Sequence, residues 1–160
     1  IDFLQIEPTL DGWQQYEAQS QGRVHSGVAI IAMKFGNHEL DQFVDNVVKP
    51  AVKEAGYDIE RISDSPRAGL IDDIMRVKIR DAPFLIADLS HDNLGAYWEA
   101  GFAEGLGKPV IYLCHEDKWA TTRTHFDTNH CETVSWRPEA AEEFQKRLVA
   151  VVRNTMLVRT

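Results

Sequence analysis

The sequence lacks most of the features that would assign it quickly to a class. It has only two cysteines in 160 residues, Cys114 and Cys131, and they lie in different segments. Such sparse cysteines argue against a disulfide framework and favour a reducing compartment, so we expect a cytoplasmic protein. The chain also has no apolar run long enough to cross a bilayer and no recognisable signal peptide, which argues against a membrane protein.

Positive charge is also in short supply. The chain carries 17 Lys and Arg against 25 Asp and Glu, for a net charge of -8. Such an acidic chain is poorly suited to nucleic acid or to an anionic membrane, so we expect neither as a partner. A small phosphate ligand stays compatible with the charge, because backbone N–H groups can bind it locally. The hydrophobic fraction of 44% and the charged fraction of 26% are typical of one globular domain.

Several sequence motifs are missing as well. There is no P-loop, no Gly-x-Gly-x-x-Gly after the first expected strand and no Gly-x-Ser-x-Gly. These absences argue against NTP hydrolysis, NAD-dependent hydride transfer and a serine hydrolase. His115, His125, His130 and Cys131 match no closed zinc pattern. We therefore expect neither a metal nor a cofactor.

What the chain does contain is a regular alternation of apolar runs and amphipathic segments. Strands are expected at 28–33, 57–62, 84–89, 110–114 and 133–136, and helices at 40–52, 71–82, 95–106 and 139–156. Alternation of this kind predicts a parallel sheet covered by helices on both faces. We therefore predict an α/β protein, a flavodoxin-like or Rossmann-like three-layer sandwich. Its five-stranded, mostly parallel sheet should have the order 2-1-3-4-5.

Two segments fall outside this alternation. Residues 1–27 begin with Ile rather than Met and include a run at 19–27 that is typical of a linker. We expect 1–27 to be an appendage, the end of a preceding domain, and 28–160 to be the α/β domain. Residues 115–130 are expected to form a long polar loop, and such loops are often functional.

The predicted strand order brings the loops after the first and third strands to one crevice, where open parallel sheets bind ligands. Met33, Lys34 and Phe35 follow the first strand. There Lys34 could meet a phosphate and Phe35 could stack on a base, although an exposed lysine is more often simply solvated. Asn93 and Gly95 open the helix after the third strand, where Asn93 is a natural cap and Gly95 would admit a ligand to the backbone.

Two carboxylates belong to the same strand–loop–helix unit. Glu99 lies just over one turn into the helix, and its side chain should point back toward the helix start. It could act as a nucleophile or general base, or it could be a solvated helix acid like Glu104. Asp88 ends the third strand, where an aspartate is either catalytic or a turn-forming residue.

Three further residues are weaker candidates. Asp72 lies near the start of the second helix, where it could hold a polar edge of a substrate or merely interact with the helix dipole. His125 and Asp127 lie close together in the expected loop, and a His near an Asp could take part in acid–base chemistry.

The stretch Asn93-Leu-Gly-Ala-Tyr-Trp-Glu99-Ala-Gly101, followed by Gly107-Lys-Pro-Val-Ile111, resembles the nucleoside 2-deoxyribosyltransferase-like superfamily, which is akin to TIR-like domains. The resemblance implies that Glu99 is the nucleophile that attacks the anomeric carbon, and that Asn93 and Gly95 line the sugar or phosphate pocket. It also implies a homo-oligomer, because those enzymes often complete each site from a neighbouring subunit. More closely, and over nearly its whole length, the chain resembles bacterial proteins of unassigned function. The residues that carry this likeness are Leu10 to Trp13, Ala32 to Phe35, the stretch around Glu99, and His125 to Thr128 before the strand that ends in Trp136.

The chain departs from the transferases at two places. It has Met33-Lys34-Phe35 where they commonly have a Gly-x-x-Phe turn, and neither Asp72 nor its neighbour aligns with their base-recognising Asp without a shift. We therefore expect an N-glycosidic enzyme, a glycosidase or deoxyribosyltransferase, that acts on a nucleoside, nucleotide or NAD-like molecule. Glu99 would be its nucleophile, and Asp88 or Asp127 would assist proton transfer. The alternatives are a non-catalytic nucleotide-binding sensor and a purely structural interaction module.

Overall fold

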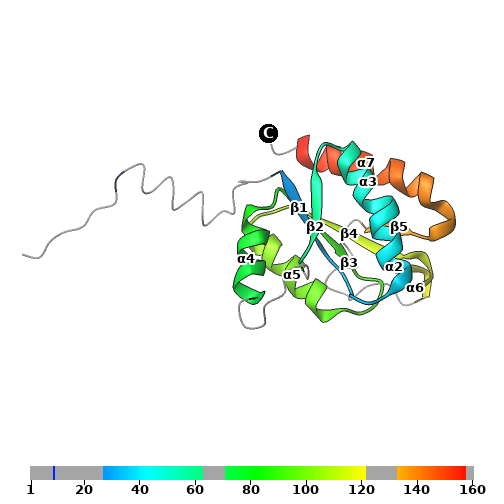
Figure 1. Cartoon of the computed structure of the whole chain (residues 1–160), viewed down its shortest axis with the longest axis horizontal. Helices are drawn as coiled ribbons and strands as arrows, with labels where there is room; N and C mark the ends of the chain where they lie inside the picture. The colour runs from blue at the N-terminus through cyan, green and yellow to red at the C-terminus, as the bar shows by residue number, and fades with distance from the viewer. Residues whose placement is uncertain (1–8, 10–26, 63–70, 122–132, 158–160) are drawn as a thin grey trace, which may run out of the picture.

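The computed structural model describes residues 9, 27–62, 71–121 and 133–157. Its strands are β1 (Val28–Ala32), β2 (Asp58–Arg61), β3 (Leu85–Asp88), β4 (Val110–His115) and β5 (Thr133–Trp136). They form one sheet of order β2-β1-β3-β4-β5, and every neighbouring pair is parallel. The predicted fold class and strand order are therefore confirmed (Figure 1).

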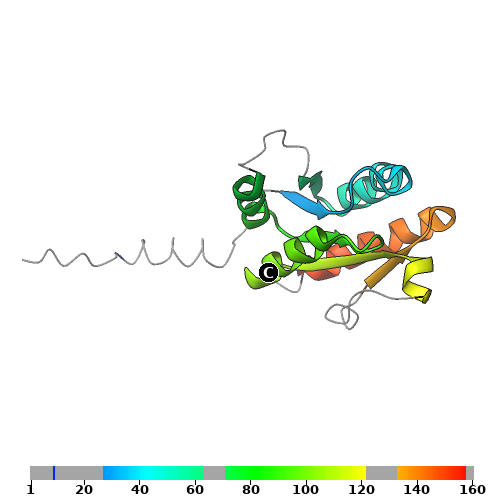
Figure 2. The ribbon, with the colours of Figure 1, turned by 90° about the horizontal axis from the view of Figure 1, so that it is seen from below.

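Helices cover both faces of this sheet (Figures 1 and 2). They are α2 (His38–Phe43), the π-helical η1 (Val44–Val48), α3 (Lys49–Glu54), α4 (Ile71–Asp81), α5 (Leu94–Gly105), α6 (Glu116–Thr121), the 3₁₀ turn η3 (Pro138–Ala140) and α7 (Ala141–Leu157). One hydrophobic cluster joins the sheet to α2, η1, α3 and α7, and a second joins its other face to α4 and α5. Burial on both faces explains why the inner strands read as continuous apolar runs.

Glycines mark the ends of two of these helices. Gly56 follows α3 with a φ of 101°, and Gly107 follows α5 with a φ of 71°. Both values lie in the left-handed region that glycine adopts at low cost, so these residues terminate the two helices.

Two segments differ from the prediction. The helix expected at 40–52 contains the π segment η1, just before Pro50. Proline has no N–H to donate and its ring crowds the preceding turn, which is a physical reason for the wider turn there. The expected loop at 115–130 is wrong over Glu116–Thr121, which form α6. None of these six residues is buried, so the helix has no apolar stripe that would reveal it.

The described residues include little of the expected appendage. The appendage expected at 1–27 lies outside the described residues, apart from Thr9 and Gly27. Among the helices that the structure describes, none is both long and apolar enough to span a membrane.

Candidate functional site

The loops that follow β1 and β3 lie at the switch point of the sheet, which is the place where the strand order changes direction. β1 pairs with β3 through Ile30, Ile31 and Ala32, so the two loops leave the sheet side by side. The Nδ2 atom of Asn37, at the end of the first loop, lies 3.0 Å from Nε2 of His91 in the second. A hydrogen bond between two residues that the sequence analysis did not single out therefore links the two loops.

Asp88 is the most thoroughly bonded residue at this edge. Its side chain is 1% exposed. Oδ1 accepts the backbone N–H of Ser90 at 3.1 Å, and Oδ2 accepts the Ser90 hydroxyl at 3.1 Å and the Trp136 indole N–H at 2.7 Å. Burial raises the pKa of Asp88, and these hydrogen bonds oppose that shift. All three donors belong to the protein, so these contacts give Asp88 a structural role, and its catalytic role stays a prediction.

The hydrogen bonds around Asp88 extend to the neighbouring strands. The Ser90 hydroxyl also accepts the backbone N–H of His115 at 2.7 Å, which ties the loop to the end of β4. The Trp136 indole stacks on Phe43 with ring centroids 4.4 Å apart and meets the His115 ring edge-to-face at 4.7 Å. Ser90 and Trp136 therefore fix the shape of the loop after β3. No local pattern indicates a role for Ser90, and the sequence predicts Trp136 only as the end of a strand.

Glu99 differs from Asp88 in the bonding of its carboxyl group. It lies in the second turn of α5 and is partly buried. Its carboxyl group has no hydrogen bond or ion pair among the described residues. Burial raises the pKa of its carboxyl from 4.5 to about 7. Burial without a partner disfavours the ionised form of a carboxyl group and so raises its pKa. Carboxyl groups with a pKa raised in this way are found more often at functional sites than elsewhere.

The start of α5 is closed by its own cap. Asn93 accepts the backbone N–H of Gly95 through Oδ1 at 3.1 Å, as the capping prediction requires. A Cβ atom at Gly95 would lie 3.2 Å from that same oxygen, so glycine suits this close turn. A role for Asn93 and Gly95 in ligand binding stays a prediction.

The three candidate residues after β1, which are Met33, Lys34 and Phe35, differ in their exposure. Lys34 and Phe35 are exposed just past β1, and Phe35 keeps 49% of its surface. Met33 is only 1% exposed and packs in the core cluster under α2 and α7. Met33 therefore packs in the core and does not present its side chain to a ligand.

The other candidates cannot be placed in the site. Asp72 belongs to α4, but its side chain is not described, and His125 and Asp127 lie outside the described residues. In the part of the chain that the structure describes, no three His, Cys, Asp or Glu side chains are grouped to hold a metal ion. Cys114 is buried, and burial raises the pKa of its thiol to about 12, so it is a poor nucleophile.

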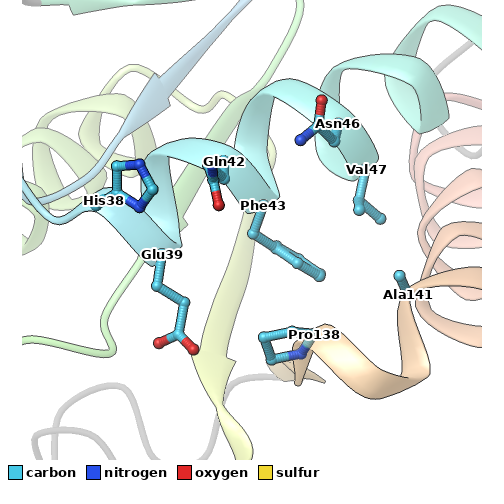
Figure 3. Close-up of a pocket in the computed structure, with 8 residues that line it drawn as sticks. All are labelled: His38, Glu39, Gln42, Phe43, Asn46, Val47, Pro138 and Ala141. Atoms are coloured by element: carbon cyan, nitrogen blue, oxygen red, sulfur yellow. The ribbon is translucent and has the colours of Figure 1, made fainter.

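An open groove of about 390 Å³ lies on the face of the sheet that α2, η1 and α7 cover. Figure 3 shows Phe43 and Pro138 facing each other across it, with His38, Glu39 and Gln42 along α2. It lies between α2 with η1 and the start of α7, whereas Glu99 lies on α5, on the opposite face of the sheet. None of the predicted site residues lines this groove, so it does not carry the predicted chemistry.

Comparisons with known proteins bear on the fold. No protein-family model and no curated protein matches the chain. Among solved structures it is similar to the TIR domain of the Toll-related receptor TRR-2 from Hydra magnipapillata, with a TM-score of 0.56 and 18% identity. The alignment covers 80% of this chain and 98% of that one. At this level of identity the likeness establishes the architecture and leaves the chemistry to the residues.

Proposed function

We propose that this TIR-like, flavodoxin-like α/β domain is an N-glycosidic enzyme acting on a nucleoside, nucleotide or NAD-like molecule, with Glu99 as the nucleophile. The observation that carries the proposal is the state of Glu99. It is a partly buried carboxylate without a described partner, and its pKa is raised to about 7. Its position, one helix turn past the loop at the switch point, is where this architecture binds ligands.

The chemistry follows the retaining, two-step scheme. The Glu99 carboxylate attacks the anomeric carbon as the bond to the base breaks, which gives a glycosyl ester on the enzyme. Water, or a ring nitrogen of an acceptor base, then attacks the same carbon, loses its proton to the residue that protonated the first base, and releases the Glu99 carboxylate. The departing base needs a proton, and Asp127 is the residue that we propose for this step, because both oxygens of Asp88 already accept hydrogen bonds from Ser90 and Trp136.

A direct assay tests the proposal. The chain, a Glu99→Gln variant and a Glu104→Gln variant are each incubated with nucleosides, nucleoside 5′-monophosphates and NAD, and free base is measured by chromatography. We expect base from the unmodified chain and from Glu104→Gln, but none from Glu99→Gln. Glu104 is the matched control because it is an exposed acid on the same helix. Equal release by Glu99→Gln would refute the assignment of the nucleophile.

The pH dependence of turnover should report the Glu99 carboxyl. A carboxylate attacks only when ionised, and the pKa of Glu99 is about 7. With saturating substrate, turnover should therefore rise roughly tenfold per pH unit below that value and level off above it. Rates measured between about pH 5 and pH 9 check this. A profile that is flat down to pH 5 would mean that an unshifted group controls the reaction.

A second candidate is a sensor that binds a nucleotide without turnover. The occupied oxygens of Asp88 favour it, because one of the two predicted proton-transfer residues is already engaged in hydrogen bonds within the protein. The same assay separates the two functions when isothermal titration calorimetry is run in parallel. Nucleotide binding by both the unmodified chain and Glu99→Gln, without base release from either, would support the sensor and exclude the enzyme.

A further inference from the structure

Apolar side chains gather on the outer side of α4 and α5, which lie side by side on one face of the sheet (Figure 1). In its described part the chain exposes five large hydrophobic side chains, and three of them belong to these two helices. They are Val77 at 53% exposure, Leu94 at 81% and Trp98 at 47%. The half-buried ring of Phe102 stacks on Trp98 with centroids 5.5 Å apart. Large apolar side chains gathered in this way mark an interaction surface more often than single ones do.

Two arginines of α4 add positive charge to this surface. The guanidinium group of Arg76 lies 5.7 Å from the ring centre of Trp98, and that of Arg80 lies 6.0 Å from the ring centre of Phe102. Arg76 also pairs with Asp73, whereas Arg80 has no ion pair among the described residues. The α4–α5 surface, as we name it, consists of Arg76, Val77, Arg80, Leu94, Trp98 and Phe102.

The composition of α5 indicates that its outer side is covered. The inner side is apolar and buried, through Ala96, Ala100 and Ala103. Only two of the twelve residues are charged, Glu99 and Glu104. A helix that is apolar on its inner and outer sides alike is normally buried on both. We therefore expect another part of the protein, or a partner, to lie on the α4–α5 surface.

The N-terminal segment of the chain has the chemistry that this surface requires. Residues 1–22 contain four acids and no lysine or arginine, although the chain as a whole carries 17 basic residues. Within them Leu10, Trp13 and Tyr16 recur at a spacing of three, which places apolar side chains close together along one side of a helical turn. The segment therefore offers apolar groups to the exposed side chains and negative charge to the two arginines.

The chain also leaves the sheet at a suitable place. β1, β3 and β4 are parallel, and α5 runs back from the end of β3 toward the start of β4, so α5 ends at the edge where β1 begins. The twelve residues of α5 make a helix about 18 Å long. The ten residues 17–26 can span about 33 Å when extended, so they can bring Leu10 to Tyr16 to any part of the surface.

We propose that residues 10–16 dock on the α4–α5 surface, with their apolar side chains against its apolar side chains and the acids of the segment near Arg76 and Arg80. A short tether gives the segment an effective concentration of about a millimolar, so a weak contact is enough to keep it docked. The inference is independent of the proposed function, because it needs neither a ligand nor turnover. It assigns to the expected appendage a place on the α/β domain.

A nitroxide spin label on the segment tests this contact in the full chain, because the label weakens the NMR signals of protons near it. The label is attached at Gln15→Cys, with Cys131→Ser to remove a competing thiol, and Cys114 is buried. We expect the indole N–H signal of Trp98 to weaken about twofold or more. The signal of Trp136, which is buried under the other face of the sheet, should keep most of its intensity. A Trp98 signal of full intensity would overturn the inference.

Matched variants show whether the label approaches by docking or by the tether alone. Trp13→Ser removes the largest apolar side chain of the segment and should restore most of the Trp98 signal. Arg80→Glu reverses one charge of the surface and should restore part of it. Arg147→Glu is the control, because it makes the same change at an exposed arginine of α7, on the other face of the sheet, and should leave the weakening as it was. The same weakening in Trp13→Ser and Arg80→Glu as in the parent would contradict docking.

A mixed sample distinguishes the segment of the same chain from that of a second copy. Spin-labelled chain without ¹⁵N is added to ¹⁵N-labelled chain without the spin label, so any weakening arises between molecules. We expect the Trp98 signal to keep its intensity in this mixture. Weakening there as strong as in the singly labelled chain would mean that one copy docks its segment on another, and the intramolecular contact would be wrong.

Discussion

At pH 8, a Glu99→Gln variant is expected to be more stable than the unmodified chain by about 1–3 kcal/mol, although it should have lost turnover by roughly a thousandfold or more. The two effects have one origin. Burial raises the pKa of Glu99 to about 7, so the folded protein holds an ionised group in surroundings that disfavour it. Glutamine keeps the shape of the side chain and removes both the charge and the proposed nucleophile.

The sign of the pH effect follows from the direction of the shift. The folded state binds the Glu99 proton more tightly than the unfolded state, whose pKa is near 4.5. Stability from this group is therefore greatest below 4.5, falls as the pH rises toward about 7 and is constant above that. Each pKa unit corresponds to about 1.4 kcal/mol, and partial solvent exposure reduces the total to the range given above.

Thermal and denaturant unfolding at about pH 4 and pH 8 measure the difference. The variant and the unmodified chain should be nearly equal at the lower pH, and at the higher pH the variant should melt about 2–10 °C higher. Glu104→Gln serves again as the control, with a small change at both pH values, because Glu104 is exposed and the oxygen of glutamine can still accept the Tyr112 hydroxyl. Equal stability of Glu99→Gln and the unmodified chain at pH 8 would show that Glu99 is not desolvated.

Removing the carboxylate of Asp88 should have the largest effect on stability. Asp88→Ala leaves the backbone N–H and hydroxyl of Ser90 and the indole N–H of Trp136 without their buried acceptor. Loss of the acceptor from a buried network with three donors typically costs about 3–5 kcal/mol, because each stranded donor keeps its desolvation cost. We expect a destabilisation of that size, measured by denaturant unfolding at about pH 7.

A double-mutant cycle shows whether the cost comes from these donors. Trp136→Phe removes one donor and keeps an aromatic ring against Phe43. Combined with Asp88→Ala, it should cost less than the sum of the two single substitutions by about 1–3 kcal/mol, because a stranded donor is no longer present. Strict additivity would contradict the hydrogen bond between Asp88 and Trp136. Asp88→Asn should also destabilise, because its NH₂ group must face one of the donors.

The architecture was predictable because its signals are local. A parallel strand buried on both faces reads as a continuous apolar run, as in Val28–Ala32 and in Leu85–Asp88 up to its final aspartate, and glycine after a helix marks its end. The short α6 escaped prediction because a solvated helix without buried residues has no apolar period. The π segment escaped because periodicity alone does not distinguish a π turn from an α turn over five residues.

The candidate site was only partly predictable, for a different reason. Glu99 could be found because it lies in the same strand–loop–helix unit as the loop that it would serve. The bonds that shape this loop connect residues far apart in sequence, with Asp88 and Trp136 separated by 48 positions and Asn37 and His91 by 54. Side-chain pairings at such separations depend on the packed sheet, so one sequence does not disclose them.

The indole of Trp136 also constrains when the site can be completed during synthesis. The ribosome makes β1, β3 and α5 well before β5, the last strand of the sheet. Until β5 docks, Asp88 lacks its indole partner and the Phe43 ring lacks the surface on which it stacks. The loop after β3 can therefore reach its final shape only after the last strand has emerged, so a nascent chain that ends before Trp136 would carry Glu99 beside an unfinished loop.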